Sequence, residues 1–314
     1  AAAQDEVAGL REKLKAAEAE RDRLKQPPQA AASATPQIEL IRDCDACPPL
    51  VNIATGAAIT LGAPHGSQDG ATALDPQTPL PAKSYFMQAH EVSVGEFKAY
   101  LKATNATFER TCLIQPGSNS MPEEVIVKEP SVFQALSLPP PPDVDDHPAV
   151  CITRDDAIGY AAWLSQKAGG GIKYELPTEI QWEYGARPRS GNPPLPPTQE
   201  YAMCALMNIA DSQFSASIQT VPVLKRIGIA DRRSDLTNCN DSTALTEPVS
   251  RRSPANPYGL ANMLGNVSEL TSSCWSPGSG AECPRYVVRG GSFASPAGLV
   301  TLWVRQSFMA SHAG

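Results

Sequence analysis

The order of apolar and polar positions divides the chain into an N-terminal helix, a linker and one long globular region. Over residues 5–26, mostly apolar positions recur at alternating steps of three and four residues, with charged side chains between them. This spacing is typical of a coiled coil, so we expect a coiled-coil helix over residues 1–26. The seam consists of Val7, Leu10, Leu14, Ala17, Arg21 and Leu24. Because an isolated helix of about three heptads is marginal in water, the seam favours association with a copy of this chain or with another protein's helix. The alternative is a solvated single helix.

Two consecutive prolines, Pro27 and Pro28, end this helix, since proline cannot continue the helical hydrogen-bond ladder. Residues 27–37 are rich in Ala, Pro and Ser, a composition that predicts a linker. We expect residues 38–314 to form a single domain.

Three helices are expected within this domain, over residues 93–103, over residues 155–167 and over a short segment after Thr178. The first and third begin with a capping box, in which Ser or Thr is followed three residues later by Glu or Gln. A run of glycines at 169–171 ends the second helix. Between residues 186 and 257, the weak periodicity predicts turns and short strands.

The composition narrows the fold class and the kinds of partner. The 30 prolines, 22 glycines and 19% charged residues favour a loop-rich α+β domain over a helical bundle. A net charge of −7 without a basic stripe argues against nucleic acid as a partner. No apolar run approaches the roughly 20 residues of a membrane-spanning helix, so we expect no transmembrane segment.

Eight cysteines are scattered through loop-like sequence, as is typical of disulfides formed in an oxidising compartment. Only Cys44 and Cys47 have a spacing suited to zinc, and no histidine lies near them. The opening residues Ala-Ala-Ala-Gln resemble the mature end left by a signal peptidase. We therefore expect a periplasmic or extracellular protein.

Several sequence blocks occur in the order found in one known family. The blocks are Cys44–Pro48 with Asn52–Gly56, His90–Phe97, His147–Thr153, Leu176–Arg187, Asn256–Leu260, Gly265–Leu270 and Arg289–Phe293. Together they resemble the formylglycine-generating-enzyme, or sulfatase-modifying-factor, family, and the resemblance covers about residues 40–314. It implies a C-type-lectin-like fold with short antiparallel strands and many loops.

The Gly265–Leu270 block also suggests a calcium site. Asn262, Gly265, Val267 and Glu269 are spaced so that a tight loop can turn two side-chain and two carbonyl oxygens onto one centre. Calcium accepts six to eight such ligands. The resemblance implies the same division: side chains from Asn262 and Glu269, carbonyls from the two residues between.

The resemblance implies a second calcium site, formed by the side chains of Asn208 and Asp241 and the carbonyls of Ile209 and Thr243. The family usually has an aromatic residue where this chain has Thr243, but a carbonyl ligand tolerates that change. The alternative is that Asn208 and Asp241 simply cap turns. Either ion would be structural.

The family's catalytic cysteine pair is replaced in this chain. Active members carry two cysteines just after the Arg-Gly-Gly-Ser stretch, five residues apart, and here those positions are Ser295 and Val300. A thiolate pair that holds Cu(I) cannot be replaced by a hydroxyl and an isopropyl group. The resemblance therefore implies the fold without the chemistry.

The resemblance and the locality of the cysteines also suggest disulfide pairs. We expect Cys274–Cys283, Cys112–Cys151 and Cys204–Cys239. Cys44 and Cys47 either pair with each other or separate to other partners.

The expected function is a secreted, non-catalytic binding or scaffold module, oligomerised or docked through its N-terminal helix. Its partner would be a copy of itself or another envelope or extracellular protein, for example in a cell-surface or filament assembly. Two alternatives stay open: a retroelement-diversified variable protein that binds ligands, and an oxidase of the formylglycine-generating type.

Overall fold

The computed structural model describes most of the expected domain. The described residues are 38–56, 59–63, 73–75, 78–114, 123–187, 200–226, 237–251, 256–275 and 283–309. The chain divides into one unit over Ala1–Ile38 and a second over Glu39–Gly314. The helix predicted over residues 1–26 and the linker predicted over 27–37 lie outside the described residues and stay predictions.

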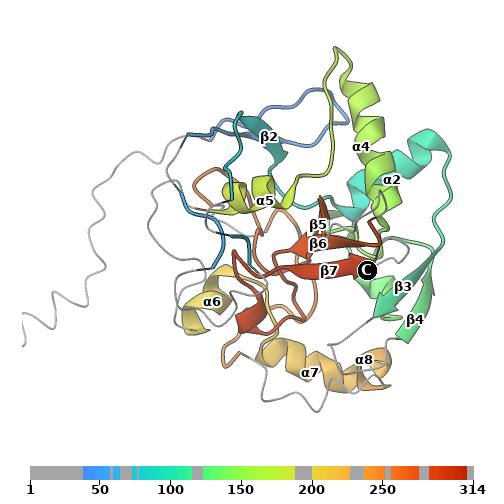
Figure 1. The fold of residues 1–314 in the computed structure, drawn as a ribbon. Helices are drawn as coiled ribbons and strands as arrows, with labels where there is room; N and C mark the ends of the chain where they lie inside the picture. Colours follow the sequence, from blue (N-terminus) through green and yellow to red (C-terminus); the bar gives the residue numbers. More distant parts are fainter. Residues whose placement is uncertain are drawn as a thin grey trace, which may run out of the picture. The chain divides into compact units, whose positions relative to one another are not determined.

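Along the second unit, two pairs of short strands separated by one helix are followed by a run of helices and then by three further strands (Figure 1). The elements are β1 (Leu50–Ile53), β2 (Tyr85–Gln88), α2 (Val94–Thr104), β3 (Arg110–Ile114), β4 (Glu123–Val127), α3 (Val132–Ala135), η2 (Val144–Asp146), α4 (Arg154–Ala168), α5 (Glu179–Ala186), α6 (Glu200–Leu206), α7 (Ser212–Thr220), α8 (Pro222–Arg226), β5 (Glu269–Cys274), β6 (Arg285–Arg289), η5 (Ala297–Leu299) and β7 (Gln306–Met309). The α+β class and the loop-rich architecture expected from the sequence are confirmed.

All strand pairs in the described residues are antiparallel. β1 pairs with β2, β3 with β4, and β5, β6 and β7 form a three-stranded sheet with β6 in the middle. In that sheet Glu269 lies opposite Arg289, so the end of the predicted calcium loop meets the start of the Arg-Gly-Gly-Ser turn.

The three predicted helices are present, and their caps explain where they begin. At α2 the Ser93 hydroxyl accepts a hydrogen bond from the Glu96 amide at 3.1 Å, and the Glu96 carboxylate accepts one from the Ser93 amide at 2.9 Å. A capping box also opens α4, one residue earlier than expected, and another opens α5. Gly169 ends α4 with a positive φ of 64°.

The prediction that residues 186–257 contain only turns and short strands is wrong, because α6, α7 and α8 lie there. Asp211 caps α7 by accepting from the amides of Gln213 and Phe214 at 2.8 and 3.0 Å. Phe214 and Leu224 bury their side chains in a cluster shared with Leu136. These helices are short, so packing stabilises them more than intrinsic propensity does.

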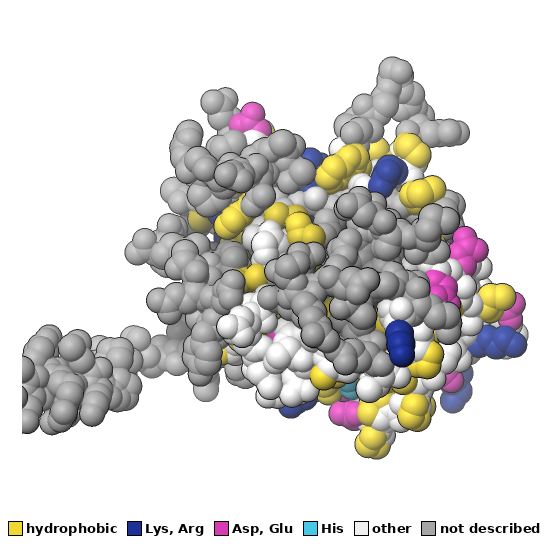
Figure 2. All heavy atoms as spheres, turned by 90° about the horizontal axis from the view of Figure 1, so that it is seen from below, with side chains coloured by type: hydrophobic (Ala, Val, Ile, Leu, Met, Phe, Trp, Pro, Cys, Tyr) yellow, Lys and Arg dark blue, Asp and Glu magenta, His cyan; other side chains and the backbone are white. Residues whose placement is uncertain are grey.

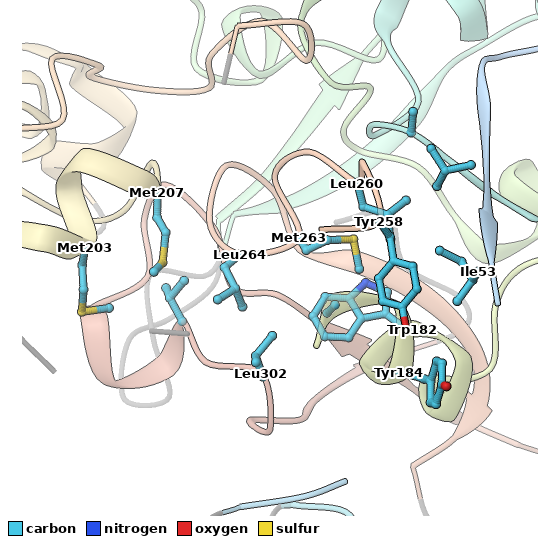
Figure 3. Close-up of a cluster of buried hydrophobic side chains, with 14 of the residues drawn as sticks. Ile53, Trp182, Tyr184, Met203, Met207, Tyr258, Leu260, Met263, Leu264 and Leu302 are labelled. Atoms are coloured by element: carbon cyan, nitrogen blue, oxygen red, sulfur yellow. The ribbon is translucent and has the colours of Figure 1, made fainter. Parts of the chain in front are cut away.

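The principal core surrounds α5 and holds the loops that carry the predicted sites (Figure 3). Trp182 and Tyr184 on α5 are fully buried, and Met263 and Leu264 from the predicted calcium loop pack into the same cluster. A second cluster joins α2 to α4 through the rings of Phe97 and Tyr160, whose centroids are 5.8 Å apart.

All eight cysteines of the chain are paired in the structure. The disulfides are Cys44–Cys47, Cys112–Cys151, Cys204–Cys239 and Cys274–Cys283. The last joins the end of β5 to the residues before β6. The alternative left open for Cys44 and Cys47 is resolved in favour of the short bridge. Within the described part of the chain, no helix combines the length and apolar character needed to span a bilayer.

Candidate functional site

A buried ion-pair network fixes the loops of the candidate site. Arg289, at the end of β6, is almost completely buried, and its guanidinium donates to the Glu183 carboxylate and to the Leu302 carbonyl, the latter at 2.6 Å. Glu183 also accepts from Arg187 and from the Gly62 amide at 2.6 Å. This network holds α5, the turn after β6 and the following loop in one arrangement.

The structure brings together the residues of the calcium site that only the resemblance implies, here called the Asn208 site (Asn208, Ile209, Asp241 and Thr243). The Asp241 carboxylate accepts from the amide of Ile209 at 2.9 Å and from the amide of Thr243 at 2.8 Å. Asp211, which the sequence did not single out, orients this segment by accepting from the Asp241 amide at 2.6 Å.

Two buried oxygens at the Asn208 site have no hydrogen-bond partner among the described residues. They are Asn208 Oδ1 and Thr243 Oγ1. The Asn208 side chain donates through Nδ2 to the Leu245 carbonyl at 2.7 Å, so its Oδ1 stays available. Leaving such an oxygen unsatisfied costs about 1–3 kcal/mol, and a bound cation would remove that cost. The residues of this site therefore fit calcium.

The calcium site predicted from the Gly265–Leu270 block, here called the Glu269 site, contains Asn262, Gly265, Val267 and Glu269. Glu91, from outside the loop, adds a further carboxylate to it. The Glu91 carboxylate, just before α2, accepts from Asn262 Nδ2 at 3.1 Å. Glu269 accepts from Trp182 Nε1 at 2.8 Å. Val267 is partly buried in the same loop, and Gly265 has a positive φ of 84°.

The electrostatics of the Glu269 site favour a bound cation. Burial raises the pKa of Glu91 to about 8, and the charge of Glu269 adds to this shift. Burial also raises the pKa of Glu269 to about 7, against the hydrogen bond from Trp182. Two desolvated carboxylates repel each other until a proton or a cation neutralises them. A divalent ion with oxygen ligands would do so, hence this site also fits calcium.

Both candidate sites would depend on amide and carbonyl oxygens. Among the residues that the structure describes, no three His, Cys, Asp or Glu side chains gather into a group that could hold a metal ion. The sets above therefore depend on Asn208, Asn262 and backbone carbonyls, as is typical of calcium and untypical of zinc.

Ser295 and Val300 lie in the turn that follows Arg289–Phe293, and both are buried. The Ser295 hydroxyl accepts from the Ser292 amide at 3.0 Å and lies 3.1 Å from the Ser292 hydroxyl. Val300 packs in the principal core with no exposed surface. A Cβ on Gly291 would lie 2.9 Å from Val300 Cγ2, so the turn closes tightly over this side chain.

A cleft of about 980 Å³ adjoins the Glu269 site. Its lining includes Phe86, Tyr174 and Phe293, with Glu91 and Gln306 among the polar groups. On the face shown in Figure 2, the coloured Lys and Arg side chains are interspersed with Asp and Glu.

Comparison with known proteins identifies the family. Residues 39–313 match the sulfatase-modifying factor enzyme 1-like domain. The chain belongs to this family. It is 27% identical to the formylglycine-generating enzyme of Bos taurus over 249 residues, covering 70% of this chain and 56% of that enzyme. The enzyme of Streptomyces coelicolor is 29% identical over 161 residues, covering 47% and 42%. The chain thus spans about half the length of the curated relatives it matches.

Solved structures of the sulfatase-modifying-factor fold agree with this assignment. PvdO from Pseudomonas aeruginosa is 25% identical with a TM-score of 0.63, covering 88% of this chain and 94% of PvdO. Variable protein 1 of Treponema denticola has a TM-score of 0.56 at 16% identity, covering 89% and 96%, and shows the fold alone. The family is therefore established, and the activity of this member has to be argued from its own residues.

Proposed function

We propose that this member of the sulfatase-modifying-factor family is a non-catalytic binding or scaffold module that calcium stabilises and that works in an oxidising, extracytoplasmic compartment. The proposal rests on the bonding of the cysteines and on the residues at the two catalytic positions. All eight cysteines are in disulfides, and the two positions where the resemblance places catalytic cysteines hold Ser295 and Val300.

The environment of these two positions supports the absence of copper chemistry. A Cu(I) centre of this type requires soft thiolate ligands. The Ser295 hydroxyl is hard, remains protonated at neutral pH and is already engaged with Ser292. Val300 offers no ligand atom and belongs to the core.

Calcium would have a structural role in this proposal. Asn208, Asp241 and the carbonyls of Ile209 and Thr243 would hold one ion, and Glu91, Asn262, Glu269 and the carbonyls of Gly265 and Val267 would hold another. A bound ion would supply positive charge that satisfies the buried oxygens and offsets the repulsion between the two carboxylates of the Glu269 site. These residues would thereby tie together loops that the apolar core does not hold.

The binding role is supported by the architecture around the cleft. Irregular loops on a rigid, disulfide-linked core are a common basis for recognition without catalysis. The apolar side chains of Phe86 and Phe293 would supply contact area, while Glu91 and Gln306 would fix polar groups of a ligand. The seam predicted over residues 1–26 would join copies of the chain or attach it to an envelope partner.

The catalytic part of the proposal is tested by an aerobic assay on a cysteine-containing sulfatase peptide, followed by mass spectrometry. The full chain, supplied with Cu(I) and calcium, is expected to leave the peptide unchanged, while the Streptomyces coelicolor enzyme in the same buffer converts it. Conversion of the peptide by this chain would overturn the proposal and restore the oxidase alternative.

The scaffold part is tested by the native mass of the full chain and of an L14D variant, which places a charge in the predicted seam. The wild type is expected to form a discrete oligomer or a complex with one fixed partner, and L14D to dissociate it. The matched control is E12K, which changes a charge outside the seam. Equal masses for all three proteins, at the mass of one chain, would refute this part.

A further inference from the structure

Asn266 lies between the two calcium sites and uses all its polar groups. It is fully buried. Its backbone amide donates to the Asn208 carbonyl at 2.8 Å, and its carbonyl accepts from the Phe293 amide at 2.9 Å. Its side-chain Oδ1 accepts from Asn208 Nδ2 at 3.2 Å, and its Nδ2 donates to Glu91 Oε1 at 2.9 Å. One side chain therefore contacts a ligand residue of each site.

The backbone of Glu247 fixes the orientation of the Asn266 amide. The Glu247 amide donates to Asn266 Oδ1 at 2.9 Å, and the Glu247 carbonyl accepts from Asn266 Nδ2 at 3.2 Å. A flipped amide would lose both bonds, so oxygen must face Asn208 and nitrogen must face Glu91. As a result, Asn208 turns its own Nδ2 toward Asn266 and leaves its Oδ1 for the cation.

The backbone of the two sites is in direct contact as well. Gly265 lies so close to Asn208 that a Cβ at position 265 would be 2.4 Å from the Asn208 carbonyl oxygen. The loop of the Glu269 site therefore cannot shift without moving the first residue of the Asn208 site.

We propose that Asn266 is a positioning residue that couples the two calcium sites, so that an ion at either site strengthens binding at the other. The inference deepens the structural calcium role proposed above and rests on it. An ion on Asn208 Oδ1 polarises that amide and makes its Nδ2 a better donor to Asn266, which in turn becomes a better donor to Glu91. The stronger donation fixes the position of the Glu91 carboxylate, so that this ligand of the second site is held in place before the second ion binds.

The ordering of the ligand side chains by the first ion also strengthens binding of the second ion. The first ion fixes Asn208, Asn266 and the loop between them, so the second ion meets ligands that are already ordered. Couplings between binding sites in proteins commonly amount to about 5- to 150-fold in affinity, and the coupling is reciprocal by thermodynamic necessity. We expect at least about a 5-fold effect here.

The test is isothermal titration of the calcium-depleted full chain with calcium chloride. Two single-site variants, D241N and E269Q, each weaken one site and leave the other to be measured. The dissociation constant of the remaining site is expected to be at least about 5-fold higher than in the wild type in both variants. Two ions bound by the wild type, with remaining sites unchanged in both variants, would overturn the coupling and leave the calcium proposal standing.

Variants at Asn266 test whether this residue transmits the effect. Asn266 has a positive φ of 55°, so N266G removes the side chain without straining the backbone. In N266G the effect of D241N on the remaining site is expected to fall to about 1-fold. The matched control is N105G, which makes the same change at an exposed asparagine with a φ of 51° after α2 and should leave the coupling intact.

Two further results keep the inference open to refutation. If N266G does not fold, N266D retains the shape and the left-handed backbone but faces Glu91 with an oxygen, and it should lose the coupling equally. Coupling of wild-type size in N266D or N266G would exclude Asn266 as the link. If the wild type binds no calcium at all, both this inference and the calcium proposal fall.

Discussion

Replacing Glu183 with glutamine should destabilise the protein more than any equivalent change at its surface. Glu183 and Arg289 are both buried, and Arg289 is held by Glu183 and by backbone carbonyls. Removing one partner of a buried pair leaves an uncompensated charge and costs about 3–5 kcal/mol. Glu179 Oε2 remains 3.9 Å from Arg289 Nη1, and the glutamine oxygen can still accept from Gly62. We therefore expect E183Q to lower the free energy of unfolding by about 3 kcal/mol, the lower end of that range.

The measurement is equilibrium unfolding of E183Q in denaturant at constant calcium, with a thermal scan beside it. A loss of about 3 kcal/mol corresponds to a Tm lower by roughly 6–12 °C for a domain of this size. The control is E175Q, where the side chain is 61% exposed and pairs with Lys173. Such surface pairs contribute about 0–1 kcal/mol. Equal free energies of unfolding for E183Q and E175Q would refute the assignment of the ion-pair network as the structural centre of the site.

Three further predictions follow from the sites and bridges. Calcium chelation should lower the Tm of the wild type, whereas an unchanged Tm in scanning calorimetry would contradict the structural role of the ion. Burial lowers the pKa of His147, so the folded state favours neutral imidazole. The contribution of neutral His147 to the free energy of unfolding should be complete above the ordinary pKa of 6.5. It should decrease as the pH falls from 6.5 through the lower pKa of the folded state, and unfolding curves of H147Q measured against pH should lack this decrease. Replacing both Cys112 and Cys151, which are 39 residues apart, with serine should lower the free energy of unfolding by about 4 kcal/mol. The same change at Cys44 and Cys47, three residues apart, should lower it by about 2 kcal/mol, and the reverse order in denaturant titrations would refute the chain-entropy argument.

The sequence predicted the features that depend on near neighbours. Capping boxes at Ser93 and Thr178 are formed by residues three positions apart, and the helices begin where these pairs predict. The helix α7 was missed because its stability comes from Phe214 packing on distant residues, which periodicity over nine residues does not reveal. The Asp211 cap is the local signal that could have indicated it.

The candidate site shows the same division. The residues of the Glu269 site came from sequence spacing and family resemblance, and those of the Asn208 site came from the resemblance alone. The structure joins Asp241 to Ile209 and Thr243 by hydrogen bonds, and calcium at either site stays a prediction. Glu91 was missed because it is 171 positions from Asn262 and meets it only in the folded chain. Asn266 was visible within a sequence block, but its role as a link depends on Asn208 and Glu247, which no spacing rule connects to it.

The tight fit of Gly265 against Asn208 has a kinetic consequence. Steric contact and backbone hydrogen bonds set the course of this loop's backbone, so an arriving ion would have to order only side chains such as those of Asn208 and Asn266. Calcium uptake should then be limited by the loss of water from the ion, with no slow folding phase in stopped-flow records. Calcium would then raise the stability of an already folded protein reversibly, and it would not be needed for folding.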